Sequence, residues 1–219
     1  MDLQQIETDL QNPDFQYRLK AIAALKDYPS EVAVPILSRH LHDSEFLVRS
    51  FVAMGLGKQR IDKSFALLLQ IMKFDNTPNV RAEAANSLSL FGRISASHLV
   101  QAFVQDDHWL VRRSILAALV ELGCAEEVLE VCQEALKGED QPVQETAVDA
   151  LGSLAQTRQQ AAALSHLLVL KDAPSDRLRV RVAYALKQFE HPAAKDALAQ
   201  LRQDPSHQVI GAALEDLVP

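Results

Sequence analysis

The sequence has few aromatic side chains and few cysteines. Aromatic residues make up 5% of the 219 residues, and the chain has one tryptophan and two cysteines, Cys124 and Cys132. Two thiols in a chain of this length do not form a disulfide framework, which favours a reducing compartment. Leu and Ala dominate the 48% apolar content. This composition favours close helix packing over a β-sandwich.

The sequence also lacks long apolar runs and an excess of basic residues. No apolar run approaches the roughly 18 residues of a membrane span, and the first residues lack the basic start and apolar stretch of a signal peptide. The net charge is −7, so the phosphate backbone of a nucleic acid would attract the chain weakly. We therefore expect a cytoplasmic protein with no membrane insertion and no nucleic-acid partner.

One sequence pattern recurs along the whole chain. An apolar anchor residue, usually followed by Arg, precedes small or apolar residues at offsets four and five and Leu at offset eight. Offsets 0, 4, 5 and 8 lie on one face of a helix, so each anchor predicts the start of an amphipathic helix, the B helix of its repeat. The anchors are separated by 31 to 35 residues and are Tyr17, Val48, Val80, Val111, Val143, Leu178 and Val209.

A second amphipathic segment, the A helix, precedes each B helix. The loop between them carries Asp, Asn or Ser, which cap helix starts, and often Pro. The sequence thus predicts an all-α solenoid of seven antiparallel helix pairs, one domain forming a single curved superhelix. The 35-residue interval predicts a longer loop near Lys171–Arg177. The expected repeats are residues 1–28, 29–59, 60–92, 93–123, 124–155, 156–189 and 190–219.

Three segments of this pattern resemble HEAT repeats, and more narrowly the HEAT-like repeat of the phycobilisome-lyase family. They are Asp106–Arg113, Pro142–Gly152 and Val80–Ala85. The resemblance covers almost the whole chain. That family includes bilin lyases that act as paired subunits and a relative involved in phycobilisome breakdown. The resemblance therefore implies a protein partner, either a phycobiliprotein or a paired HEAT-like subunit, and allows a bilin as the one ligand.

No residue of this chain matches a catalytic motif of that family, so we assign none. The primary hypothesis is a non-catalytic scaffold that binds a protein on its B helices, without a cofactor. The alternative is a bilin lyase subunit, or a factor that detaches or carries the chromophore. The histidines and cysteines lack the spacing of metal ligands, so we expect no metal site, and the two cysteines are expected to be buried.

The Arg after most anchors and the Asp before most B helices recur together. A groove that grips a partner would explain such charges, but function rarely needs one pair in so many repeats. We therefore expect a structural ladder of Asp–Arg contacts between neighbouring repeats. The arginines are Arg18, Arg49, Arg81, Arg112 and Arg179.

Candidate contact residues lie at the remaining B-helix positions. In HEAT-like stacks the B helices line the concave face, and offsets 2, 3 and 6 should be exposed because offsets 0, 4, 5 and 8 are buried. Phe51 with Met54 forms an apolar pair there, and Arg181 with Tyr184 forms a pair of the types enriched in interfaces. Arg113 is a further candidate at offset 2. The alternative is that curvature or a loop covers these side chains.

Two further features are candidates for contacts. Trp109 with His108 could stack on a ligand, although packing of Trp109 under the inter-repeat loop is the favoured interpretation. The last B helix is apolar from Val209 to Leu214, whereas a terminal repeat should be polar outside. That end of the chain is therefore a candidate contact with another chain.

Overall fold

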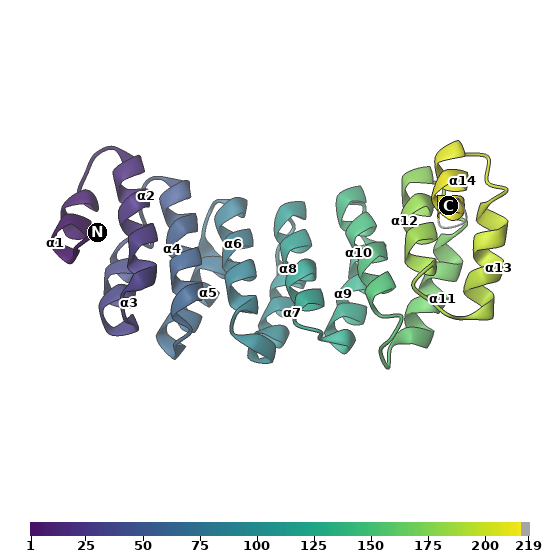
Figure 1. Cartoon of the computed structure of the whole chain (residues 1–219), viewed down its shortest axis with the longest axis horizontal. Coiled ribbons are helices and arrows are strands. Elements are labelled where there is room, and N and C mark those ends of the chain that lie inside the picture. The colour runs from purple at the N-terminus through teal and green to yellow at the C-terminus, as the bar shows by residue number, and fades with distance from the viewer. Residues whose placement is uncertain (216–219) are drawn as a thin grey trace. The chain divides into compact units, whose positions relative to one another are not determined.

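A computed structural model describes residues 1–215 of the chain and contains fourteen α-helices and two short 3-10 helices in that range, without a strand. The helices follow one another as seven A–B pairs, which confirms the predicted all-α solenoid of helical repeats (Figure 1). The A helices are α1 (Leu3–Asp9), α3 (Ser30–Arg39), α5 (Asp62–Phe74), α7 (Ala96–Gln105), α9 (Ala125–Lys137), α11 (Gln160–Leu170) and α13 (Pro192–Leu201). The B helices are α2 (Phe15–Ala24), α4 (Phe46–Gln59), α6 (Pro78–Ser89), α8 (Trp109–Glu121), α10 (Gln141–Ser153), α12 (Asp176–Leu186) and α14 (His207–Leu214).

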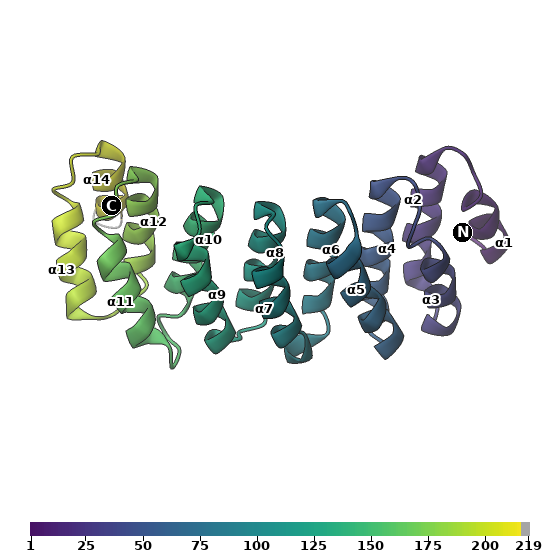
Figure 2. The ribbon, with the colours of Figure 1, turned by 180° about the vertical axis from the view of Figure 1, so that it is seen from behind.

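The chain forms two compact units, Met1–Ala118 and Leu119–Pro219, and the division falls within α8. In the first unit α2, α4 and α6 form one layer, and α3, α5 and α7 form the other (Figures 1 and 2). The second unit repeats this arrangement, with α10, α12 and α14 in the B layer. Within each unit, consecutive B helices contact each other more extensively than consecutive A helices do.

The core of each repeat is built from the predicted anchor face. The six anchors that follow Tyr17 are each at most 6% exposed; they are Val48, Val80, Val111, Val143, Leu178 and Val209. The exception is Tyr17, which is 45% exposed, so the prediction was wrong for the first repeat. There the core is formed by the later positions Ala21, Ile22 and Leu25, and the Tyr17 ring faces Lys20, whose ammonium lies 5.5 Å from its centroid.

The extra residues of the 35-residue interval do not lie near Lys171–Arg177. Arg179 donates to the carbonyl of Ala173 at 2.8 Å, just as Arg49 donates to that of Asp43 at 2.8 Å, so the loop before α12 keeps the register of the other repeats. They lie instead before α11, around residues 154–159, because α11 begins 17 residues after its anchor Val143 whereas α5, α9 and α13 begin 14 residues after theirs. The predicted position was wrong because the sequence interval between anchors does not say which of two loops is longer.

The last repeat uses most of its apolar residues internally. Val209, Ala212 and Ala213 are at most 3% exposed, and only Ile210 and Leu214 are partly accessible. The expectation of an apolar outer face on α14 was therefore wrong for the three buried residues.

Candidate protein-interaction surface

Four of the recurring arginines form the expected ladder between neighbouring repeats. Arg49 donates from Nε and Nη2 to the two carboxylate oxygens of Asp75, at 2.7 and 3.0 Å, and from Nη1 to the carbonyl of Asp43. Both oxygens are held in the fork geometry that suits a guanidinium. The same two-point pairing joins Arg18 to Asp43, Arg81 to Asp106 and Arg179 to Asp204.

Each ladder aspartate also holds the turn that precedes the next B helix. One carboxylate oxygen of Asp75 accepts a hydrogen bond from the backbone amide of Thr77 at 2.9 Å, and Asp204 accepts one from Ser206 at 2.8 Å. The hydrogen bonds from Arg179 hold the pKa of Asp204 below its ordinary value, although burial opposes the shift. These residues are therefore part of the architecture and not a free charged surface.

The ladder is interrupted in the middle of the chain. The positions equivalent to the ladder aspartates are Gly138 and Ala173, which have no carboxylate. Arg112 forms no ion pair within residues 1–215; its Nε donates to the carbonyl of Asp106 and its guanidinium lies 5.3 Å from the Phe103 ring centroid. The structural interpretation of Arg112 holds, but its partner is backbone and an aromatic ring.

The first unit exposes apolar side chains on its B-helix layer. Met54 is 41% exposed and Phe51 is half-buried, so both side chains reach the surface at the predicted positions. Phe46 and Leu47, in the first turn of the same helix, are 39% and 38% exposed. They were not predicted because only positions after the anchor were considered, whereas α4 begins two residues before its anchor Val48. Ala82, which was expected on this face, is buried.

An apolar residue stands two positions before the anchor in every B helix of the first unit. This apolar row consists of Phe15, Phe46, Pro78 and Trp109. The equivalent residues of the second unit are polar, namely Gln141, Asp176 and His207. We use the term B-helix face for the apolar row together with Leu47, Phe51, Met54 and Arg113.

Trp109 lies open to solvent at the start of α8. Its side chain is 40% exposed, so the interpretation that it packs under a loop was wrong. The His108 ring stacks beside it, with centroids 5.9 Å apart and planes at 25°, and the Arg113 guanidinium lies 5.6 Å from the Trp109 centroid. His108 is also tied to the helix start, because its Nδ1 accepts the amide of Leu110 at 3.2 Å. This places His108, Trp109 and Arg113 in one accessible cluster.

The second predicted pair lies on α12 in the second unit. Arg181 is accessible but forms an ion pair of 3.2 Å with Asp149 of α10, with both side chains 47% exposed. Burial raises the pKa of Asp149; Arg181 opposes this shift and Glu145 adds to it. Tyr184 is 40% exposed beside Lys187, whose ammonium lies 5.3 Å from the ring centroid. Both predicted residues are therefore accessible.

The two cysteines are buried, as expected, and neither is disulfide-bonded. Burial raises the pKa of the Cys132 thiol to about 12, and its Sγ lies 3.4 Å from the carbonyl of Ala147. A thiol held in this way is a poor nucleophile, because the thiolate is the reactive form.

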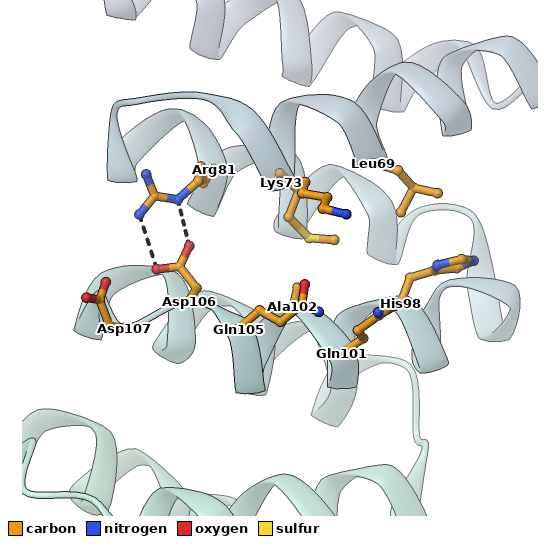
Figure 3. Close-up of a pocket in the computed structure, with 10 residues that line it drawn as sticks. Leu69, Lys73, Arg81, His98, Gln101, Ala102, Gln105, Asp106 and Asp107 are labelled. Carbon is orange, nitrogen blue, oxygen red and sulfur yellow. Dashed lines mark hydrogen bonds and ion pairs between the residues drawn. The ribbon is translucent and has the colours of Figure 1, made fainter.

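Two hollows lie between A helices of the first unit, on the layer that sequence reasoning did not examine. The larger, of about 400 Å³, lies between α5 and α7 and includes Lys73, Gln101 and Gln105 (Figure 3). The smaller, of about 260 Å³, lies between the end of α3 and α5. Within residues 1–215 no three His, Cys, Asp or Glu side chains are grouped for a metal ion, and no helix there is long and apolar enough to cross a membrane.

The sequence matches the family profile of HEAT repeats over residues 4–89, 40–120, 94–173 and 134–218. No curated protein matches the sequence. The fold is similar to that of the complex of CpcE and CpcF of phycocyanin lyase from Nostoc sp. PCC7120, with a TM-score of 0.54 and 20% identity over 100% of this chain and 95% of that one. It is also similar to Escherichia coli YibA, with a TM-score of 0.66 and 17% identity over 100% and 84% of the two chains. Identities this low show the fold alone.

Proposed function

Because this chain belongs to the HEAT-repeat family, we propose that it is a non-catalytic scaffold that binds another protein on the B-helix face of residues 1–118. The observation that carries the proposal is the set of exposed apolar side chains on that face. Phe46, Met54 and Trp109 are each about two-fifths exposed, on helices that a repeat fold presents in a regular array. Large apolar side chains exposed on one layer of a folded chain are candidates for a contact site.

The composition of the face supports a protein as the occupant. Aromatic residues, Met and Arg are the types enriched at the centres of protein interfaces, and Trp109, Phe46, Met54 and Arg113 are of these types. The Arg113 guanidinium lies over the Trp109 ring, which holds both side chains for contact without burying either. In the second unit, Arg181 and Tyr184 are candidates for a separate contact.

The test is affinity capture followed by mass spectrometry in the source organism. The wild-type chain is compared with a variant carrying Phe46→Ala, Met54→Ala and Trp109→Ala. The matched control is Ile94→Ala, which removes an equally apolar and 65% exposed side chain outside the face. We expect specific partners of the wild type to remain with the control and to be lost from the triple variant. Capture of every partner at full yield by the triple variant would refute the proposal.

A phycobiliprotein is the partner that we propose first, on the basis of the family resemblance and the fold similarity to the CpcE–CpcF complex. Titration with purified phycocyanin checks this choice independently of the capture experiment. We expect the triple variant to bind at least tenfold more weakly than wild type, as the loss of central interface side chains requires. If the wild-type protein did not bind phycocyanin, phycocyanin would be excluded as the partner, but the proposal that the B-helix face binds a protein would not be affected.

The second candidate function is that of a bilin lyase subunit or a chromophore carrier, favoured by the same fold similarity. In that role the described cysteines would not hold the bilin, because both are buried and the Cys132 pKa is about 12. The test mixes the protein with phycocyanobilin and an apo-phycobiliprotein, with and without a second HEAT-like subunit. A shifted absorption spectrum or a covalent adduct is the expected result, and an unchanged spectrum in both mixtures would count against it.

A further inference from the structure

The two hollows of the first unit are successive copies of one groove. Residues that line the smaller hollow have equivalents 31 or 32 positions later in the larger one, in the spacing of the repeat. The equivalent pairs are Leu41 and Lys73, Arg49 and Arg81, Gln70 and Gln101, Ile71 and Ala102, Phe74 and Gln105, Asp75 and Asp106, and Asn76 and Asp107.

The difference in size follows from two of these pairs. Ala102 and Gln105 of α7 stand where α5 has Ile71 and Phe74. The missing branched side chain leaves space beneath the groove, and the aromatic ring is replaced by an amide. These two replacements account for the larger volume of the hollow between α5 and α7.

The chemistry of the two hollows also differs. In the smaller hollow the charged side chains Asp43, Arg49 and Asp75 are already in ion pairs. The rest of its lining consists of three apolar side chains and three polar ones, namely Leu41, Ile71 and Phe74, and His42, Gln70 and Asn76. In the larger hollow the Lys73 ammonium forms no ion pair with any residue of 1–215. It projects from α5 opposite Gln101 and Gln105 of α7 (Figure 3).

Asp107 is the charge that would oppose an acidic group in the larger hollow. It lies at the end of the hollow where Arg81 and Asp106 are paired, away from His98 (Figure 3). The hydrogen bonds to Asp106 raise the pKa of Arg81, and the charge of Asp107 adds to this effect. Arg81 thus offsets part of the field of Asp107. Lys73 has no carboxylate partner within residues 1–215, and its ammonium lies 5.2 Å from the centroid of the Phe74 ring.

We propose that this groove binds an extended peptide segment of a partner protein, with an apolar side chain in the smaller hollow and an acidic side chain beside Lys73 in the larger one. Neighbouring packed helices lie about 8–10 Å apart, which corresponds to about three residues of extended chain. The two side chains are therefore separated by about three positions in the peptide. Gln70 and Gln101 form no side-chain hydrogen bond within the described residues, and their amides can both donate to and accept from a peptide backbone. This site is on the A layer and is independent of the B-helix face.

The experiment selects phage-displayed random linear peptides on the full-length protein and measures the enriched sequences as synthetic peptides by fluorescence anisotropy. We expect enrichment of an acidic residue about three positions from an apolar one. Lys73→Ala should weaken binding about tenfold, because a charge-assisted hydrogen bond is lost. Asp107→Asn should tighten it, because a like charge is removed. Ala102→Ile, which copies Ile71 of the preceding repeat, should abolish it by filling the hollow.

The opposite signs expected for Lys73→Ala and Asp107→Asn separate binding from folding, since a damaged fold weakens binding in both. Val169→Ala, which removes a 75% exposed side chain in the second unit, is the control that should bind as wild type does. Failure to enrich an acidic–apolar pair, or equal binding by wild type and Ala102→Ile, would overturn the proposal. So would concentration-dependent self-association in sedimentation that Ala102→Ile abolishes, because the occupant would then be a second copy of the chain. None of these outcomes depends on Phe46, Met54 or Trp109.

Discussion

At the scale of single residues, the recurring Arg and Asp residues are explained by the backbone groups to which they form hydrogen bonds. The Arg179 guanidinium donates to a carboxylate of the next repeat and to a carbonyl of its own loop. Asp204 accepts hydrogen bonds from Arg179 and from the amide of Ser206, the residue before α14. A planar group with five donors can satisfy these acceptors together, whereas lysine cannot. The same pair therefore recurs in four contacts between neighbouring repeats, and it is missing where Gly138 and Ala173 replace the aspartate.

Asp204→Asn should lower the free energy of unfolding by about 2–3 kcal/mol at neutral pH, because Arg179, 12% exposed, is left without its charged partner. The substitution keeps the shape of the side chain and one acceptor oxygen. Urea denaturation followed by circular dichroism measures the change. The control is Asp196→Asn, an exposed carboxylate on α13 that should leave stability within about 0.5 kcal/mol of wild type. Equal stability of the two variants would contradict a structural role for the ladder.

The same pair predicts a dependence of stability on pH. The pKa of Asp204 is lower in the folded chain than its ordinary value, because of the hydrogen bonds from Arg179. Its contribution is therefore complete above the unfolded pKa of about 4 and is lost as the pH falls through the lower folded value. Wild type should lose more stability than Asp204→Asn when the pH is lowered from about 5 to about 3. Parallel losses in urea melts at both pH values would show that Asp204 does not contribute.

At the scale of the helices, the B layer is close-packed where a small residue faces a small residue. A Cβ placed on Gly57 of α4 would lie 2.8 Å from the Cβ of Ser87 in α6, and one on Gly152 of α10 would lie 3.1 Å from the Cα of Ala185 in α12. Both glycines stand nine positions after their anchor, and both facing residues stand seven positions after theirs. The contact is thus a repeated feature of neighbouring B helices in each unit.

Gly57→Ala should lower the free energy of unfolding by about 1–3 kcal/mol, because α4 and α6 must separate to admit the methyl group. Gly211→Ala in α14 is the matched control, since nothing lies within 4 Å of its added Cβ. There, alanine should be neutral or stabilising by up to about 1 kcal/mol, as helix propensity requires. Thermal and urea denaturation of the two variants measure the difference, and a Gly57→Ala chain as stable as wild type would disprove the close contact.

At the scale of the whole molecule, the negative charge is concentrated in one repeat. Residues 1–118 carry thirteen basic and thirteen acidic side chains, whereas residues 124–155 carry one lysine and eight acidic residues, a net −7 equal to that of the entire chain. On α9, Glu126, Glu130 and Glu134 are exposed four positions apart, so that like charges face each other. The neutral first unit, which carries the B-helix face and both hollows, has no such excess.

Glu130→Gln should raise the free energy of unfolding by about 0.5 kcal/mol at low salt, because two like-charge contacts on α9 are removed. The gain should disappear near 1 M salt, where charges are screened within about 3 Å. Urea denaturation at both salt concentrations measures it. Glu190→Gln, an exposed carboxylate outside this repeat, should show no comparable gain at low salt. A gain for Glu130→Gln that persists at high salt would point to helix propensity and not to charge.

The sequence by itself determined the helix pairs, the anchor face and the ladder. Each repeat packs on its neighbours through the same positions, so the period of the pattern already contains the contacts, as Arg49 with Asp75 and Val80 in the core show. The tertiary structure decided which departures from the pattern matter. It exposed Trp109 and Tyr17, buried Ala82 and moved the insertion to residues 154–159.

The candidate sites show the same division. Phe51 and Met54 were predicted because each can be read from one helix, but the hollows could not be. The volume of a hollow depends on the size of the side chains that line it. Ile71 on α5 and Ala102 on α7 occupy equivalent positions 31 residues apart, and the smaller side chain lines the larger hollow. A one-dimensional period records which positions are equivalent. Only the packed structure shows where a smaller side chain leaves a hollow, because the empty volume depends on which neighbouring side chains surround that position.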